Sequence, residues 1–180
     1  MNANHPEQDS TPKPVLLPAG QSLGKPVAQL RPVGASLSAS LPEGRLTPND
    51  DHDPSQYEGT FYAQVGGRET FRKLAEKFYE SVGEDTEFRA MYPETDLRPA
   101  TMRLQLFLEQ YWGGPTTYSE RRGHPRLRMR HAPFKIDQRG RDRWIALMEA
   151  AIAEAALPVE VIPALRSFFH QAGTFMINHP

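Results

Sequence analysis

The chain has 180 residues and a formal net charge of −1, so its length suits one domain with an additional segment, and its charge gives no general attraction to nucleic acid or membranes. It contains no cysteine, which excludes disulfides and thiolate metal sites and suits a reducing compartment. The first residues lack the features of a signal peptide, and no apolar run approaches the roughly 20 residues of a membrane-spanning helix. We therefore expect a cytoplasmic protein with no integral membrane segment.

The first 55 residues differ in composition from the rest of the chain. They hold nine of the 17 prolines and no Phe, Tyr or Trp, so they cannot bury enough apolar surface to offset the entropy lost on ordering. We predict a disordered N-terminal arm at residues 1–55 and a single folded domain at residues 56–180.

The first predicted helix of this domain lies at residues 70–83. Apolar residues recur there at steps of three and four, and they place on one face Phe71, Leu74, Phe78 and Val82. Thr70 is the expected N-cap, and Gly83 is the expected C-cap. A short helical turn is predicted at residues 86–91, before Pro93.

The middle of the domain has a second long helix, predicted from Pro99 to about Trp112 and ended by Gly113-Gly114-Pro115. Residues 115–125 are expected to form a loop, because Gly123 and Pro125 interrupt them. A short helix is predicted at residues 125–131.

Two further helices complete the domain. Asp137 is expected to start one whose inward face includes Trp144, and the other is predicted from Pro158, with Pro163 either delaying its start or kinking it. No segment alternates polar and apolar residues as a strand does, so the predicted class is all-α.

His131 is the residue whose chemistry is least explained by packing. It follows Leu127 by four residues, so both point to the same side of the short helix. The simple interpretation is a buried histidine of the core. No HxxxH or HExxH pair accompanies it, which argues against a zinc site, whereas a haem iron needs only one protein ligand.

The surroundings of His131 favour a haem site without deciding it. Arginines that could pair with haem propionates lie close in sequence or on the preceding long helix, namely Arg103, Arg126, Arg128 and Arg130. Aromatic side chains with polar tips that could contact a bound diatomic molecule are Tyr79, Tyr92 and Trp144. The alternative is a nucleic-acid-binding surface, since residues 121–143 hold nine basic residues, but no recognised motif supports it and we expect no nucleic-acid partner.

Several stretches together resemble the group II (O-type) truncated haemoglobins. They are FYESVGEDTEFRAMYPETDL, FLEQYWGGP followed by GHPRLRMRHAPF, and RDRWIALM, and the resemblance extends over about residues 57–178. It implies a two-over-two helical sandwich around haem b. His131 matches the proximal iron ligand of the family, and Tyr79, Tyr92 and Trp144 match distal residues that stabilise a bound ligand.

The resemblance also assigns the remaining contacts of the haem. Ala100 takes the position of the distal histidine of ordinary globins, and Leu104 follows one helical turn later. The other expected haem contacts are Arg103, Phe107, Tyr118, Arg130, Phe134 and Trp144.

The implied function is reversible binding of oxygen, with nitric oxide, carbon monoxide or peroxide as further ligands. A peroxidase or a nitric-oxide dioxygenase using the same haem is the alternative. An external reductase is expected because the chain has no flavin or nicotinamide motif, and the resemblance leaves a homo-oligomer open.

Overall fold

The computed structural model describes residues 54–180, so the prediction of a disordered arm lies almost wholly outside the described residues. These residues contain no strand. Their helices, in chain order, are η1 (Pro54–Tyr57), α1 (Phe61–Gln64), α2 (Gly67–Glu84), α3 (Thr86–Arg89), α4 (Arg98–Tyr111), α5 (Thr117–Arg122), α6 (Leu127–His131), α7 (Gln138–Glu154) and α8 (Ile162–Met176). The all-α prediction is confirmed.

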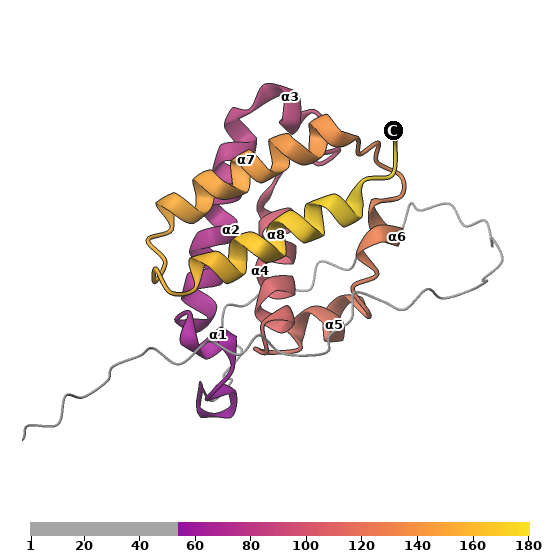
Figure 1. The fold of residues 1–180 in the computed structure, drawn as a ribbon. Coiled ribbons are helices and arrows are strands. Elements are labelled where there is room, and N and C mark those ends of the chain that lie inside the picture. The colour runs from indigo at the N-terminus through magenta and orange to yellow at the C-terminus, as the bar shows by residue number, and fades with distance from the viewer. Residues whose placement is uncertain (1–53) are drawn as a thin grey trace, which may run out of the picture. The chain divides into compact units, whose positions relative to one another are not determined.

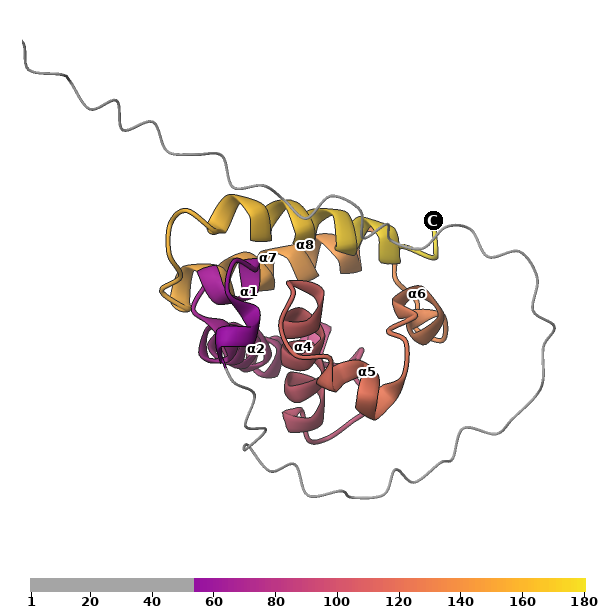
Figure 2. The same ribbon diagram turned by 90° about the horizontal axis from the view of Figure 1, so that it is seen from below.

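Four long helices form two packed pairs (Figure 1). Helix α2 packs against α4 and also against α7, and α7 packs against α8. Figure 2 shows α7 and α8 together on one side, with α2 and α4 beneath them. This arrangement is the two-over-two sandwich that the sequence predicts.

The predicted apolar face of α2 forms the centre of the core. Phe71, Leu74, Phe78 and Val82 are all buried, because the 3.6-residue period brings them to one side of the helix. Most of the exposed face of α2 carries ion pairs, including Arg72 with Glu76 at 2.6 Å. The ends of α2 differ from the prediction.

Helix α2 begins three residues before the predicted cap. Gly66 is the N-cap, with a φ of 98° that suits glycine, and Thr70 lies inside the helix, where its hydroxyl donates to the Val65 carbonyl at 2.6 Å. Gly83 is also inside the helix. Asp85 follows the helix and caps α3, accepting a hydrogen bond from the Phe88 N–H at 2.9 Å.

The predicted loop at residues 115–125 was wrong, because residues 117–122 form α5. Tyr118 is buried there, and Ser119 is fixed to α4 by two hydrogen bonds with the Gln110 amide, at 2.8 and 2.9 Å. A six-residue helix is too short to show a period in the sequence. The last helix, α8, starts at Ile162 with Pro163 in its first turn, which is the delayed start that the sequence left open.

Candidate functional site

His131 is the last residue of α6, and its ring is oriented by a hydrogen bond within the same helix. Its Nδ1 atom lies 2.7 Å from the backbone carbonyl oxygen of Leu127. A carbonyl oxygen can only accept, so Nδ1 carries the proton and Nε2 keeps its lone pair. The imidazole is therefore prepared to bind a metal ion through Nε2.

The turn before α6 is closed by Arg130. Its guanidinium donates to the carbonyl oxygens of Pro125 at 2.8 Å and Arg122 at 2.7 Å. The structure thus gives this predicted haem contact a second role, because the side chain fixes the backbone that leads into the helix of His131.

The end of α6 is held by Asn178, a residue that the sequence analysis missed. Its side-chain amide donates to the carbonyl oxygens of His131 at 3.3 Å and Phe134 at 2.9 Å, and accepts from the Ile136 N–H at 3.0 Å. These contacts join residues more than 40 positions apart, so no local pattern could reveal them. Asn178 fixes the backbone on which His131 stands.

Tyr79 of α2 and Tyr92, which follows α3, are brought together. Their ring centroids lie 5.7 Å apart in an edge-to-face arrangement. Burial raises the pKa of Tyr79, and burial and then the neighbouring Tyr79 raise the pKa of Tyr92 well above its ordinary value. Both phenols therefore stay protonated at neutral pH and can donate hydrogen bonds.

Arg103 of α4 lies close enough to both phenols for its charge to lower their pKa, although burial outweighs this effect. Its guanidinium also pairs with Glu94 at 2.8 Å. Ala100, one turn earlier on α4, is buried, and Leu104 packs on the edge of the core.

Trp144 of α7 is half-buried between aromatic rings. Its ring lies edge-to-face with Phe78 and with Phe169, at centroid distances of 6.0 and 5.9 Å. Among residues 54–180, no group accepts a hydrogen bond from its indole N–H, which leaves this donor available to a ligand. Gly173 of α8 touches the ring, since a Cβ built there would lie 3.2 Å from Trp144 Cε3.

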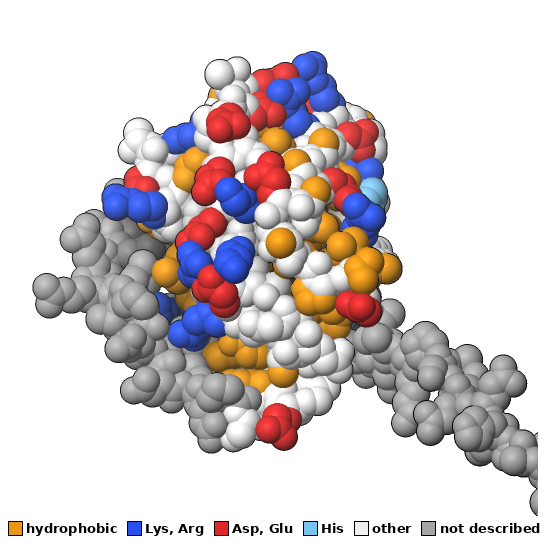
Figure 3. Space-filling view, turned by 90° about the vertical axis from the view of Figure 1, so that its left-hand side faces the viewer, with side chains coloured by type: hydrophobic (Ala, Val, Ile, Leu, Met, Phe, Trp, Pro, Cys, Tyr) orange, Lys and Arg blue, Asp and Glu red, His pale blue; other side chains and the backbone are white. Residues whose placement is uncertain are grey.

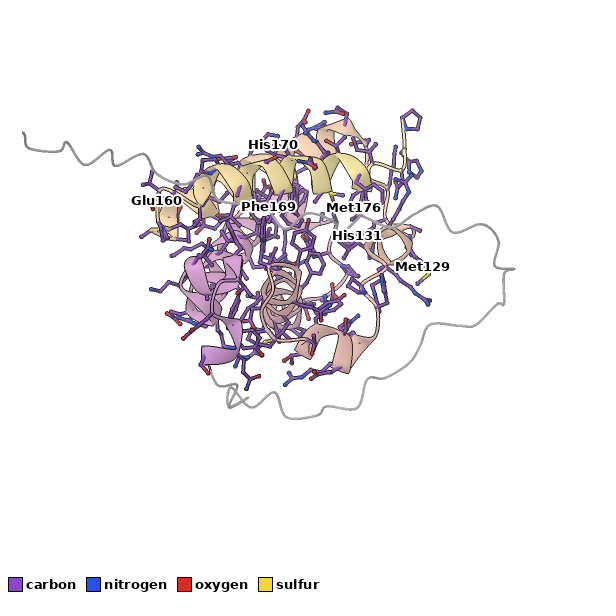
Figure 4. The ribbon with its side chains drawn as sticks, turned by 60° about the horizontal axis from the view of Figure 1, so that its bottom comes forward. Met129, His131, Glu160, Phe169, His170 and Met176 are labelled. Atoms are coloured by element: carbon purple, nitrogen blue, oxygen red, sulfur yellow. The ribbon has the colours of Figure 1, made fainter. Side chains whose placement is uncertain are left out.

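The other predicted haem contacts form two separate pairs. Phe107 of α4 lies edge-to-face with Tyr118 of α5 at 5.8 Å, and His131 lies edge-to-face with Phe134 at 6.5 Å. Figure 4 shows His131 on the side of α6 that is nearer to Met176 of α8. No direct side-chain contact within the described part of the chain joins His131 to Tyr79 or Trp144.

Comparison with known sequences decides the family. A sequence model of the bacterial-like globins matches residues 60–178. The chain belongs to this family. It is 34% identical over 112 residues to the group 2 truncated haemoglobin YjbI of Bacillus subtilis, a match that covers 62% of this chain and 84% of that protein.

Solved structures place the chain among the group II truncated haemoglobins. A thermostable haemoglobin from Thermobifida fusca is 56% identical with a TM-score of 0.66, and the match covers 67% of this chain and 98% of that one. A truncated oxygen-avid haemoglobin from Bacillus subtilis is 33% identical with a TM-score of 0.61, and the match covers 65% and 98% of the two chains.

As a bacterial-like globin the protein binds haem, and its residues fit that group. The fit is one of donor chemistry, because a haem iron needs a single neutral imidazole from the protein and His131 offers its Nε2 atom. Within residues 54–180, no cluster of three or more His, Asp or Glu residues could hold a metal ion. No helix in the same range is long and apolar enough to cross a membrane.

Proposed function

We propose that this truncated haemoglobin holds haem b through His131 and binds oxygen reversibly. The observation that carries the proposal is the hydrogen bond from His131 Nδ1 to the Leu127 carbonyl, which fixes the tautomer and leaves Nε2 to the iron. When bound, the haem supplies an iron atom with one position open to a diatomic molecule. The oxygen-avid relative from Bacillus subtilis supports oxygen as that molecule.

The distal residues are proposed to hold the ligand by hydrogen bonds. Tyr79, Tyr92 and Trp144 are the donors, because both phenols are protonated at neutral pH and the indole N–H has no partner within the described part of the chain. Ala100 and Leu104 are apolar, so neither donates a hydrogen bond to the ligand as a distal histidine would. Each hydrogen bond to a polarised oxygen contributes about 1–3 kcal/mol, so two of them slow release by orders of magnitude.

The remaining predicted residues are proposed to contact the propionates and the edge of the porphyrin. Arg103 offers the cation, and Tyr118 offers a phenol beside Phe107. Phe134 packs against the porphyrin beside His131. Arg130 acts mainly through the backbone that it fixes.

The test is the absorption spectrum of the purified chain. We expect the intense haem band to be lost in His131→Gly and restored by added imidazole, which refills the space of the missing ring. The control is His170→Gly, which removes an exposed histidine on α8 and keeps the band. Retention of an unchanged band in His131→Gly would refute the proposed ligand, and a chain that stays colourless with added haemin would refute the cofactor.

A further inference from the structure

Helix α6 and the residues beside it carry a cluster of positive charge with which no Asp or Glu of residues 54–180 forms an ion pair. No Asp or Glu occurs between Glu120 and Asp137. Arg126, Arg128 and Lys135 are exposed there, and none of them forms an ion pair within the described residues. Arg128 instead donates to the Phe175 carbonyl at 2.6 Å, and its guanidinium lies over the Phe175 ring, 5.5 Å from the centroid, so the side chain is anchored on α8 without a carboxylate partner.

The four long helices are organised differently. Every Arg and Lys in α2, α4, α7 and α8 pairs with a carboxylate. Figure 3 shows the side of the molecule that lies opposite α6 in Figure 1, where positive and negative side chains alternate. The unpaired positive charge on α6 is therefore a local feature and not a consequence of the composition, whose net charge is −1.

An exposed apolar side chain lies next to these cations in the sequence. Met129 is 59% exposed, the second largest exposure among the large hydrophobic side chains of the described residues. It lies two residues before His131, so the helical turn directs the two side chains to different sides of α6, and Figure 4 shows Met129 pointing outward. We name the exposed residues Arg126, Met129 and Lys135, which lie in and beside α6, the α6 basic face.

We propose that the α6 basic face is the docking surface for an acidic one-electron carrier protein that reduces the haem iron. The inference rests on the proposed function, which needs an external reductant to return ferric iron to the ferrous state. Negative charge on the partner complements the unpaired cations and speeds its encounter. Met129 supplies an exposed apolar contact.

The position of the face suits electron transfer. Met129 and His131 lie on opposite sides of one short helix, whose width is about 10–12 Å with side chains. A carrier seated on Met129 is therefore separated from the proximal imidazole by little more than this helix. A haem bound to His131 would take one electron from the carrier, which would reduce ferric to ferrous iron without exchange of a proton or a bond.

Two measurements on the full chain test the proposal, with a plant-type [2Fe–2S] ferredoxin as the acidic carrier. The first is calorimetric titration of the oxidised ferredoxin into the ferric chain, where no electron can move. We expect binding at low salt that weakens as salt is raised, and that falls about tenfold or more in Arg126→Glu/Lys135→Glu. The second is the rate at which reduced ferredoxin converts the ferric chain to its carbon monoxide complex, and we expect the same fall.

The control variant is Lys73→Glu/Arg166→Glu, which changes the net charge equally on α2 and α8 and should leave both measurements within about twofold. Met129→Ala should weaken binding without changing its salt dependence. Equal binding and reduction in wild type and in the α6 variant would overturn the proposal.

Other partners give distinct results. If duplex DNA or anionic vesicles bind more tightly than ferredoxin and the α6 variant loses that binding, the face belongs to that partner and our proposal is overturned. Self-association that the same variant abolishes would also overturn it. The haem band of every variant is recorded first. A missing band in the wild-type chain refutes the proposed function. Calorimetry does not depend on electron transfer, so it tests the docking face separately.

Discussion

The candidate site depends on which side-chain atoms carry protons. His131 Nδ1 donates a hydrogen bond to the Leu127 carbonyl, and the phenols of Tyr79 and Tyr92 keep their protons because burial disfavours the charged form. The result is one ring nitrogen on α6 and several hydrogen-bond donors on α2, on α7 and after α3. We propose that the nitrogen serves a haem iron and that the donors serve a diatomic molecule.

Removal of a distal donor should hasten oxygen release. In Tyr79→Phe or Trp144→Phe the lost hydrogen bond, worth about 1–3 kcal/mol, is expected to raise the dissociation rate roughly 5- to 100-fold. Stopped-flow displacement of oxygen by carbon monoxide measures this rate. Tyr57→Phe, at the edge of the domain, is the control. Unchanged dissociation in both distal variants would remove these residues from the ligand site.

The buried phenols also predict the response to alkali. Because burial holds the pKa of Tyr79 and Tyr92 above that of a free phenol, the unfolded chain loses these protons first as pH rises. The free energy of unfolding should therefore fall above about pH 10. Urea unfolding at a series of pH values measures the slope, and Tyr79→Phe/Tyr92→Phe should flatten it. An equally steep decline in that variant would contradict the assignment.

Among the elements, the four long helices and the short helices α3 and α6 were predicted from sequence, whereas α1 and α5 were not. The apolar periods of α2, α4, α7 and α8 persist over several turns, so each was recognised. Helix α5 is too short for a period, and its buried Tyr118 is explained only by packing on Phe107. The hydrogen bonds of Asn178 to the end of α6 depend on the packed fold, which local patterns do not contain.

Helix α8 sets the position of Trp144 through Gly173. In Gly173→Ala the new methyl group would lie 3.2 Å from the indole ring and should push it, so we expect oxygen dissociation to rise several-fold. The matched control is Gly83→Ala in α2, where a Cβ meets nothing within 4 Å. It should raise the free energy of unfolding by about 0.5–1 kcal/mol and leave oxygen release unchanged. Identical oxygen kinetics in both variants would exclude this role of Gly173.

Considered as a whole, the domain supports α6, the helix that carries the proposed iron ligand His131, from the periphery. Helix α6 has no buried residue and packs mainly against α8, while the C-terminal residues hold its end. An element with few buried contacts belongs to the less stable part of a fold. Haem bound to His131 would tie α6 to the core, so cofactor binding and the stability of this part of the molecule are coupled.

The N-terminal segment is expected to be dispensable for haem binding. The family match begins at residue 60, and the Thermobifida fusca haemoglobin is 98% covered by 67% of this chain, so a related globin folds without a counterpart of this segment. We propose that residues 56–180 form the globin domain.

A chain that starts at residue 48, where the second compact unit begins, should keep the haem band and unfold within a few degrees of the full chain. A chain that starts at residue 67 should be clearly less stable, because it loses Phe61, which stacks on Trp112 at 4.1 Å. If the first truncation also lost the band, the arm would be part of the functional domain.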